Sequence, residues 1–494
     1  MTRPAKAVET DSPDEADEGE GAMKEFHTRH FPSGAFVPGS LRGVNPRRSD
    51  AVILNSLLGT RPVEKFPREV LQSVVATGFT GDAPARGRFK EFVEEVWFPK
   101  NRGRMGNAGL EILISHIKLG NAFRPKQHYG GDRWAQAILA TGGFNQEQDR
   151  AALRHVLDRA QQRTMNLVEK AMYDSLQENI RPGEPEAASL LPLKDLNVAI
   201  CRLVRGLVAQ GTWPDSSTDD AERIVLDVVA LLRTGMYLNW LLMHEQAFRS
   251  VMAFRKDEIP SFLTPTLVFG MSREKRSGTG RSFHETQSHL DMAFEEGSFA
   301  IIALSQLHGT MEWKEAHWFD ELAGGLGQKK PTSKTLSWFS EYGRALLAEK
   351  PDLAPYMPEK APATTLEALS EMYTAISRNF RKWREKDNTR FSHRSTIGAV
   401  TSMALAEGGA LFAPGSGNRK HVPMIDLDLY LLVGRAQMNA NGRTTARIRI
   451  SQELQNLGIN IDDETEAQIE HELERSGRIR KLSDAGESLY VRVD

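Results

Sequence analysis

Cysteine is nearly absent from this 494-residue chain, which contains only Cys201. A single cysteine excludes an internal disulfide framework and a thiolate metal cluster, and it fits a reducing compartment. Apolar residues flank Cys201 on both sides. We therefore expect a buried core thiol, no nucleophilic role for it, and a cytoplasmic location for the protein.

A secretory leader and an uninterrupted apolar span are also missing. Residues 1–22 are acidic and polar and have no apolar core, so no signal peptide is expected there. The longest apolar run, Ile224–Met243, contains Asp227, Arg233 and Asn239. Each of these polar residues is costly in hydrocarbon, so the run predicts a buried helix and no membrane partner.

The common catalytic motifs are missing as well. The chain contains no GxxxxGK[ST] loop, no GxSxG elbow and no dinucleotide-binding fingerprint after a predicted strand. One enzymatic hypothesis is left open, a metal-dependent hydrolase in which Glu285 and His289 share a helix face. His284 and His289 are five residues apart, which rotates them about 140° from one another and does not give the zincin spacing. The favoured expectation is no catalytic residue, no metal and no cofactor.

Charge is balanced overall, with a net charge of −2, but it is segregated along the chain. Residues 1–30 predict an acidic disordered tail, in which residues 1–24 hold seven Asp/Glu against three Lys/Arg. Residues 31–144 predict a basic, loop-rich region, since Phe31–Trp134 carries sixteen Lys/Arg and nine Asp/Glu. Such separation favours at least one surface that binds a polyanion.

The next part of the chain has the apolar periodicity of long amphipathic helices. A stripe from Leu153 to Leu176 predicts one helix that begins near Asn145, and Leu193–Ala209 predicts a second. Asp219–Lys256, with Thr218 as its expected cap, predicts a third. The fold class is therefore mainly α, with a long-helix bundle over residues 145–259 and a second helical region over residues 260–412.

Basic residues recur in four places, each of which is a candidate contact to a phosphate backbone. In the predicted helix Leu366–Lys386 they follow one face at positions i, i+3, i+4 and i+8, while apolar residues mark another face. The alternative for each patch is an ordinary solvated surface. The candidate nucleic-acid-binding residues are Arg42, Arg47, Arg48, Arg102, Arg104, Arg273, Lys275, Arg276, Arg281, Arg378, Arg381, Lys382 and Lys386.

After a predicted linker at residues 413–424, residues 425–494 show three helical patterns followed by a two-strand pattern. The predicted helices are Ile425–Met438, Ala446–Leu457 and Glu464–Arg475, and the predicted strands are Arg478–Leu482 and Ser488–Val493. This order and these lengths resemble the winged helix-turn-helix. The resemblance implies that Glu464–Arg475 takes the place of the recognition helix and Ser483–Glu487 that of the wing tip.

The charge of that third helix is unusual for a DNA reader. It carries five glutamates and one arginine, and residues 425–494 hold nine Lys/Arg against thirteen Asp/Glu. Because such a face repels phosphate, a protein-docking role is favoured, with Glu466, Glu470 and Glu474 as the docking residues. Basic residues in the second helix (Arg447, Arg449) and at the wing base keep a DNA-reading alternative open.

These observations favour a non-catalytic, nucleic-acid-binding adaptor or subunit of a larger complex, in a setting such as defence or chromosome maintenance. Its expected partners are DNA or RNA and a protein, or a second copy of the chain, bound through the C-terminal module. A self-assembling coat or nucleoprotein is the structural alternative. The metal-dependent hydrolase is the enzymatic alternative.

Overall fold

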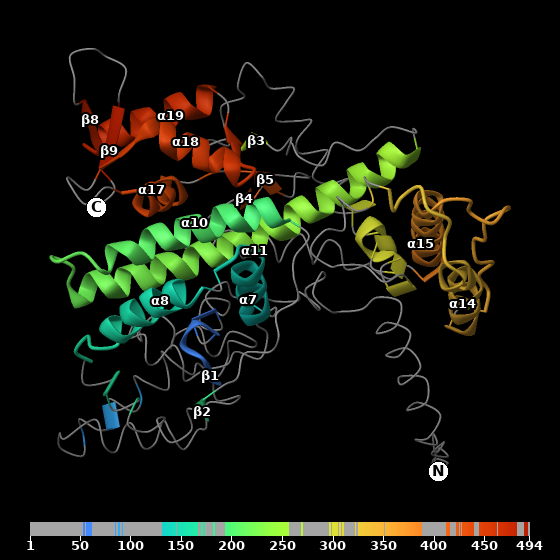
Figure 1. The fold of residues 1–494 in the computed structure, drawn as a ribbon, viewed down its shortest axis with the longest axis horizontal. Helices are drawn as coiled ribbons and strands as arrows, with labels where there is room; N and C mark the ends of the chain where they lie inside the picture. The colour runs from blue at the N-terminus through green and yellow to red at the C-terminus, as the bar shows by residue number, and fades with distance from the viewer. Residues whose placement is uncertain are drawn as a thin grey trace, which may run out of the picture.

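The protein is mainly helical, with short strands near its two ends and between its helical parts (Figure 1). The computed structural model describes residues 53–54, 56–61, 84, 87–88, 91, 131–144, 146–165, 169–170, 173, 181–182, 193–255, 268–269, 296–297, 299–304, 306–307, 309–310, 322, 325–349, 351–387, 412–414, 421–423, 425, 427–438, 444–461, 463–481 and 489–492.

Four helices form a bundle in the middle of the chain: three lie in the range predicted for it, residues 145–259, and the first lies in residues 31–144, a region predicted to be loop-rich. They are α7 (Gly131–Thr141), α8 (Glu147–Ala160), α10 (Lys194–Gln210) and α11 (Thr218–Arg255). Helix α10 runs beside α11, and α7 and α8 pack across this pair (Figure 1). The apolar run Ile224–Met243 lies within α11, and its hydrophobic side chains are largely buried in the common core, so the predicted buried helix is confirmed.

An amide pair aligns α10 with α11. Asn197 and Asn239 are both fully buried, and each donates to the side-chain oxygen of the other, at 3.0 and 2.8 Å. Each also donates to a backbone carbonyl one turn back in its own helix, those of Leu193 and Gly235. A buried polar pair that finds its partners only in one alignment fixes the register of two helices.

Two helix ends differ from the sequence predictions. Helix α8 ends at Ala160, well before Leu176, and the following turn brings Arg163 to Glu169 and Glu222. Helix α11 is capped by Ser217 instead of Thr218: the Ser217 hydroxyl accepts from the Asp220 N–H, and the Asp220 carboxylate accepts from Ser217. This reciprocal arrangement satisfies two free groups of the first turn at once.

The second helical region contains two long helices, α14 (Ser333–Glu349) and α15 (Thr365–Asp387). In α14, Trp338 stacks on Tyr342 with ring centroids 4.7 Å apart, and its indole N–H donates to Gln306. Helix α15 packs on α11 through its apolar face, which includes the buried residues Leu369 and Met372. The apolar periodicity predicted for this helix is therefore confirmed.

The C-terminal part has three helices and a small antiparallel sheet. The helices are α17 (Leu427–Ala436), α18 (Arg447–Asn456) and α19 (Asp463–Arg475), and the strands are β6 (Thr444–Ala446), β8 (Ile479–Lys481) and β9 (Leu489–Arg492). The order in the sheet is β6-β9-β8, with Thr445 opposite Val491 and Arg480 opposite Tyr490. The C-terminal module is our name for residues 427–492.

Three further two-stranded pairings connect distant or adjacent segments. Strand β3 (Val268–Phe269) runs parallel to β7 (Asn460–Ile461), which precedes α19 in the module. Near the bundle, β1 (Thr60–Arg61) pairs with β2 (Arg181–Pro182). The segment predicted as a linker contains an antiparallel pair, β4 (Phe412–Pro414) and β5 (His421–Pro423).

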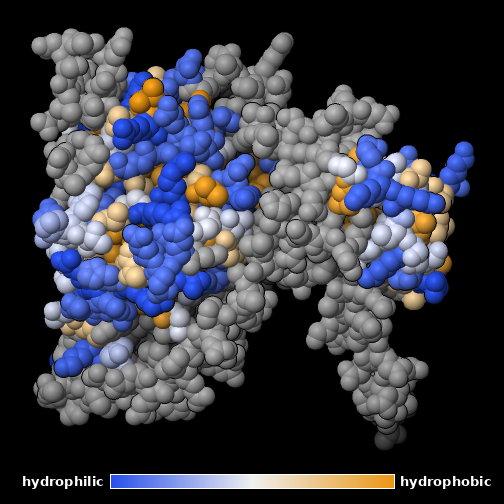
Figure 2. All heavy atoms as spheres, in the orientation of Figure 1, coloured by the Kyte–Doolittle hydropathy of each residue, from blue (hydrophilic) through white to orange (hydrophobic). Residues whose placement is uncertain are grey.

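A single hydrophobic cluster extends from the bundle into the C-terminal module. It includes Leu203 and Leu207 of α10, Leu429 and Leu432 of α17, and Ile469 of α19. On the face shown in Figure 2, the described surface is mainly hydrophilic, and hydrophobic residues form small separate patches. No helix within the described ranges is long and apolar enough to cross a membrane.

Candidate interaction site

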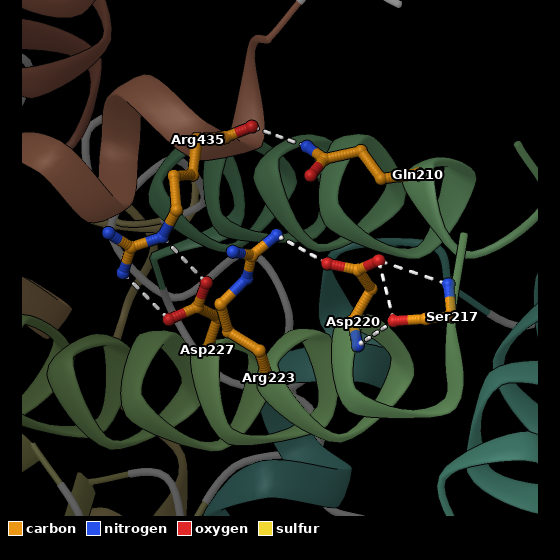
Figure 3. Close-up of polar contacts among 6 residues, drawn as sticks. All are labelled: Gln210, Ser217, Asp220, Arg223, Asp227 and Arg435. Carbon is orange, nitrogen blue, oxygen red and sulfur yellow. Dashed lines mark hydrogen bonds and ion pairs between the residues drawn. The ribbon is translucent and has the colours of Figure 1, made fainter. Parts of the chain in front are cut away.

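The C-terminal module is held on the bundle through its first helix, α17. Arg435, in the last turn of α17, makes two hydrogen bonds to the carboxylate of Asp227 in α11, each 2.7 Å long (Figure 3). The two side chains are 21% and 13% exposed. A two-pronged guanidinium–carboxylate pair that is mostly withdrawn from water is directional and only weakly screened, so it fixes the orientation of α17.

Backbone contacts with α10 complete the attachment of α17. The Gln210 side chain donates to the Arg435 carbonyl (Figure 3). Gly206, one turn earlier in α10, lies directly under the backbone of Ala436, where a Cβ would be only 1.8 Å from the Ala436 oxygen. Glycine is therefore required here for close approach of the two helices.

Helix α18 adds an ion pair, because Arg202 of α10 donates to Glu453. The residues that lie against α17 and α18 thus come from two neighbouring bundle helices. Helix α19 lies on the other side of α17 and α18, away from the bundle (Figure 1). The module is consequently attached by its first two helices, and its third helix is turned outward.

An ionic network joins α18 to α19 inside the module. Arg447 lies 2.6 Å from Glu470 and 3.8 Å from Glu466, and Ser451 donates to Glu466 at 3.1 Å. Beneath this network Tyr430 of α17 is fully buried, and burial raises the pKa of its phenol well above the ordinary value. The network thus pairs one arginine with two carboxylates above a buried aromatic side chain.

This geometry separates the three predicted docking residues into two kinds. Glu466 and Glu470 are half-buried and bonded within the module, whereas Glu474 is exposed. Asp463 is also exposed on α19, and Glu472 pairs with Arg475 one turn along the helix. Of the three predicted docking residues, Glu474 is the exposed carboxylate, whereas a partner that bound Glu466 or Glu470 would compete with their bonds to α18.

The basic face of α15 is also partly occupied by contacts within the protein. Arg381 forms an ion pair with Glu296, and Arg378 lies 5.2 Å above the ring of Tyr356. Arg378 and Arg381 are both exposed and Lys382 is half-buried. A guanidinium has five N–H donors, so one ion pair or one ring contact does not use all the donors of these exposed arginines, and the three residues stay a predicted positive stripe.

Most of the remaining predicted contacts to nucleic acid lie outside the described residues. Lys386 belongs to α15, but its side chain is not described. Glu285 and His289, the residues of the hydrolase hypothesis, also lie outside the described residues. The residues outside the described ranges are Arg42, Arg47, Arg48, Arg102, Arg104, Arg273, Lys275, Arg276 and Arg281.

The described ranges contain neither a reactive cysteine nor a cluster of metal-binding side chains. Cys201 is fully buried, as predicted, and burial raises the pKa of its thiol to about 12. Such a thiol stays protonated and is a poor nucleophile. Among the described residues, no group of three or more His, Cys, Asp or Glu side chains is arranged to hold a metal ion.

The contacts that attach the module were not found from the sequence. Asp227 stands in the sequence as a polar interruption of an apolar run, and Arg435 and Gly206 give no local pattern. The available signal is the cost of burying the Asp227 carboxylate, which implies a partner for it but does not identify that partner. The partner of Asp227 is 208 residues away in the chain.

Comparison with known proteins adds no relationship: no protein-family model matches the chain, and no curated protein is significantly similar to it.

Proposed function

We propose that the protein is a non-catalytic adaptor that binds a nucleic acid and uses its C-terminal module, a winged helix, to dock a protein. One observation carries the docking part of the proposal: α17 is anchored by Arg435 and Asp227, while the acidic helix α19 lies on the outer side. A helix held in a fixed orientation presents its side chains to a partner at low entropic cost.

The charges on α19 favour a protein partner with lysines or arginines over DNA. Its exposed residues include Asp463 and Glu474. Of the two arginines of α18 that support the DNA-reading alternative, Arg447 is engaged by two carboxylates, whereas Arg449 is exposed. A groove-reading helix needs donors for phosphates and base edges, and this outer face offers mainly acceptors.

Zero-length carbodiimide cross-linking of the full chain in its native extract tests the docking role, because it joins carboxylates only to amines in direct contact. We expect Asp463 and Glu474 to couple to lysines of one protein, and Glu474→Gln to lower that yield. Glu341→Gln, an exposed carboxylate on α14, is the matched control. Cross-links from α19 confined to its own chain would contradict the docking role.

The nucleic-acid part of the proposal is supported by the stripe Arg378, Arg381 and Lys382 on α15. Each phosphate neutralised by such a residue releases condensed counterions, so binding must weaken steeply as salt is added. We expect log K for duplex or single-stranded DNA or RNA to fall linearly with log salt. Alanine at all three positions should lower the affinity and the slope, and an unchanged slope would exclude this stripe.

A further inference from the structure

Arg447 occupies a position where a winged helix would meet a phosphate backbone. It is the first residue of α18, and both α18 and α19 take part in the resemblance to a DNA-binding module. In helix-turn-helix proteins the two helices of the motif lie against the backbone and in the groove, and arginine is a common phosphate ligand. A guanidinium here is therefore suited to nucleic acid, unless another anion already holds it.

The protein supplies that anion itself. Glu470 lies 2.6 Å from one terminal nitrogen of Arg447, and Glu466 lies 3.8 Å from the other. The Ser451 hydroxyl donates to Glu466 and so orients it toward the arginine. The three charged side chains are 29–30% exposed, which makes their attraction less screened than that of a fully solvated pair.

Two carboxylates facing one guanidinium leave an excess negative charge where a phosphate would approach. A phosphate could reach Arg447 only by displacing Glu470 and by standing close to Glu466. Like-charge contacts of this kind are how an interface rejects a wrong partner. The other acids of α19 differ, since Glu474 is exposed and Glu464 contacts Gln468 of its own helix.

We propose that Glu466 and Glu470 exclude nucleic acid from the C-terminal module by occupying Arg447, and so reserve this module for a protein partner. The inference rests on the proposed function, in which nucleic acid binds elsewhere in the chain. It makes Glu466 and Glu470 specificity-determining residues, distinct from Glu474, whose role is contact with the partner. Neutralising the two should open a second binding surface for duplex nucleic acid.

The test compares two full-length double variants that change the net charge equally. In Glu466→Gln/Glu470→Gln the arginine is released, whereas in Asp428→Asn/Glu464→Gln, which changes an exposed carboxylate of α17 and a half-buried carboxylate of α19, it remains paired. We expect the first variant alone to bind a labelled DNA duplex more tightly than wild type, with a salt slope steeper by roughly one unit for the added phosphate contact. Adding Arg447→Gln to that variant should abolish the gain.

A second measurement keeps the proposal falsifiable if the double variant does not fold. Arg447→Gln in the otherwise wild-type chain should leave duplex affinity and salt slope unchanged, because the arginine is already occupied. Weaker binding by this variant would overturn the proposal. Equal gains in duplex affinity in both double variants would also overturn the proposal, since net charge alone would then explain them. No gain in duplex affinity in a folded Glu466→Gln/Glu470→Gln protein would overturn it as well. Carbodiimide coupling of Glu474 to a protein partner is a separate measurement, so failure of the docking role is distinguished from failure of this proposal.

Discussion

Replacing Gly206 by alanine should detach α17 from the bundle while making α10 itself a better helix. An added Cβ would be 1.8 Å from the Ala436 oxygen, whereas a comfortable contact is roughly 3.5 Å. Because the opposing atom is backbone, α17 must move by roughly 1.7 Å. A shift of that size is incompatible with the 2.7 Å bonds between Arg435 and Asp227.

The free-energy cost can be worked from these contacts. Hydrogen bonds to charged groups contribute roughly 1.5–3 kcal/mol, and the partial exposure of this pair suggests a total loss of about 2–3 kcal/mol for the docked state. The gain in α10 from glycine to alanine is about 1 kcal/mol, but it applies to docked and undocked forms alike. The undocked population should therefore rise roughly 30- to 140-fold.

Hydrogen exchange of the α17 amides measures that population directly. Ala209→Gly is the matched control, since Ala209 is an exposed residue of α10 and the substitution reverses the propensity change without a clash. It should cost about 1 kcal/mol and leave α17 exchange unchanged. Wild-type exchange of α17 in Gly206→Ala would refute the reasoning that close backbone approach depends on this glycine.

Three further outcomes are expected. Asn197→Leu should lower the free energy of unfolding by roughly 2–3 kcal/mol, because the Asn239 amide loses its partner. Asn197→Leu/Asn239→Leu should recover part of that loss in denaturant unfolding. A single variant as stable as wild type would disprove the register role. Burial raises the pKa of Glu222 above 4.5, so its contribution to stability is present at lower pH and lost as pH rises through the folded pKa. Urea unfolding from pH 4 to 8 should show a flatter profile for Glu222→Gln, and parallel profiles would contradict this. Cys201 should resist a thiol reagent in the native protein and react only on unfolding, so rapid native labelling would contradict its burial.

Local sequence patterns predicted the helices better than their ends or their partners. The 3.6-residue periodicity located α10, α11, α15 and the three helices of the module, because burial of one face repeats along each of them. The prediction that this helix continues to Leu176 was wrong. Helix α8 ends at Ala160, and the turn after it places Arg163 against two carboxylates, a tertiary contact that the apolar stripe does not reveal. The cap at Ser217 was missed by one residue since adjacent serine and threonine are both good caps.

The candidate site was predicted in part, and for a related reason. The acidic character of α19 is visible in its sequence, but the division of its glutamates between Arg447 and solvent depends on how α18 packs against it. The basic stripe of α15 was likewise visible, whereas the pairing of Arg381 with Glu296 was not. Composition gives the charges of a surface, and packing decides which of them are free to act.

The attachment of α17 to α11 has a consequence for how the chain is made. Asp227 leaves the ribosome 208 residues before Arg435 does. At typical synthesis rates this leaves the α10–α11 surface uncovered for roughly 10–40 s. During that interval Gly206 and Asp227 lack the contacts that α17 supplies, so this attachment can form only after the last seventy residues have been made.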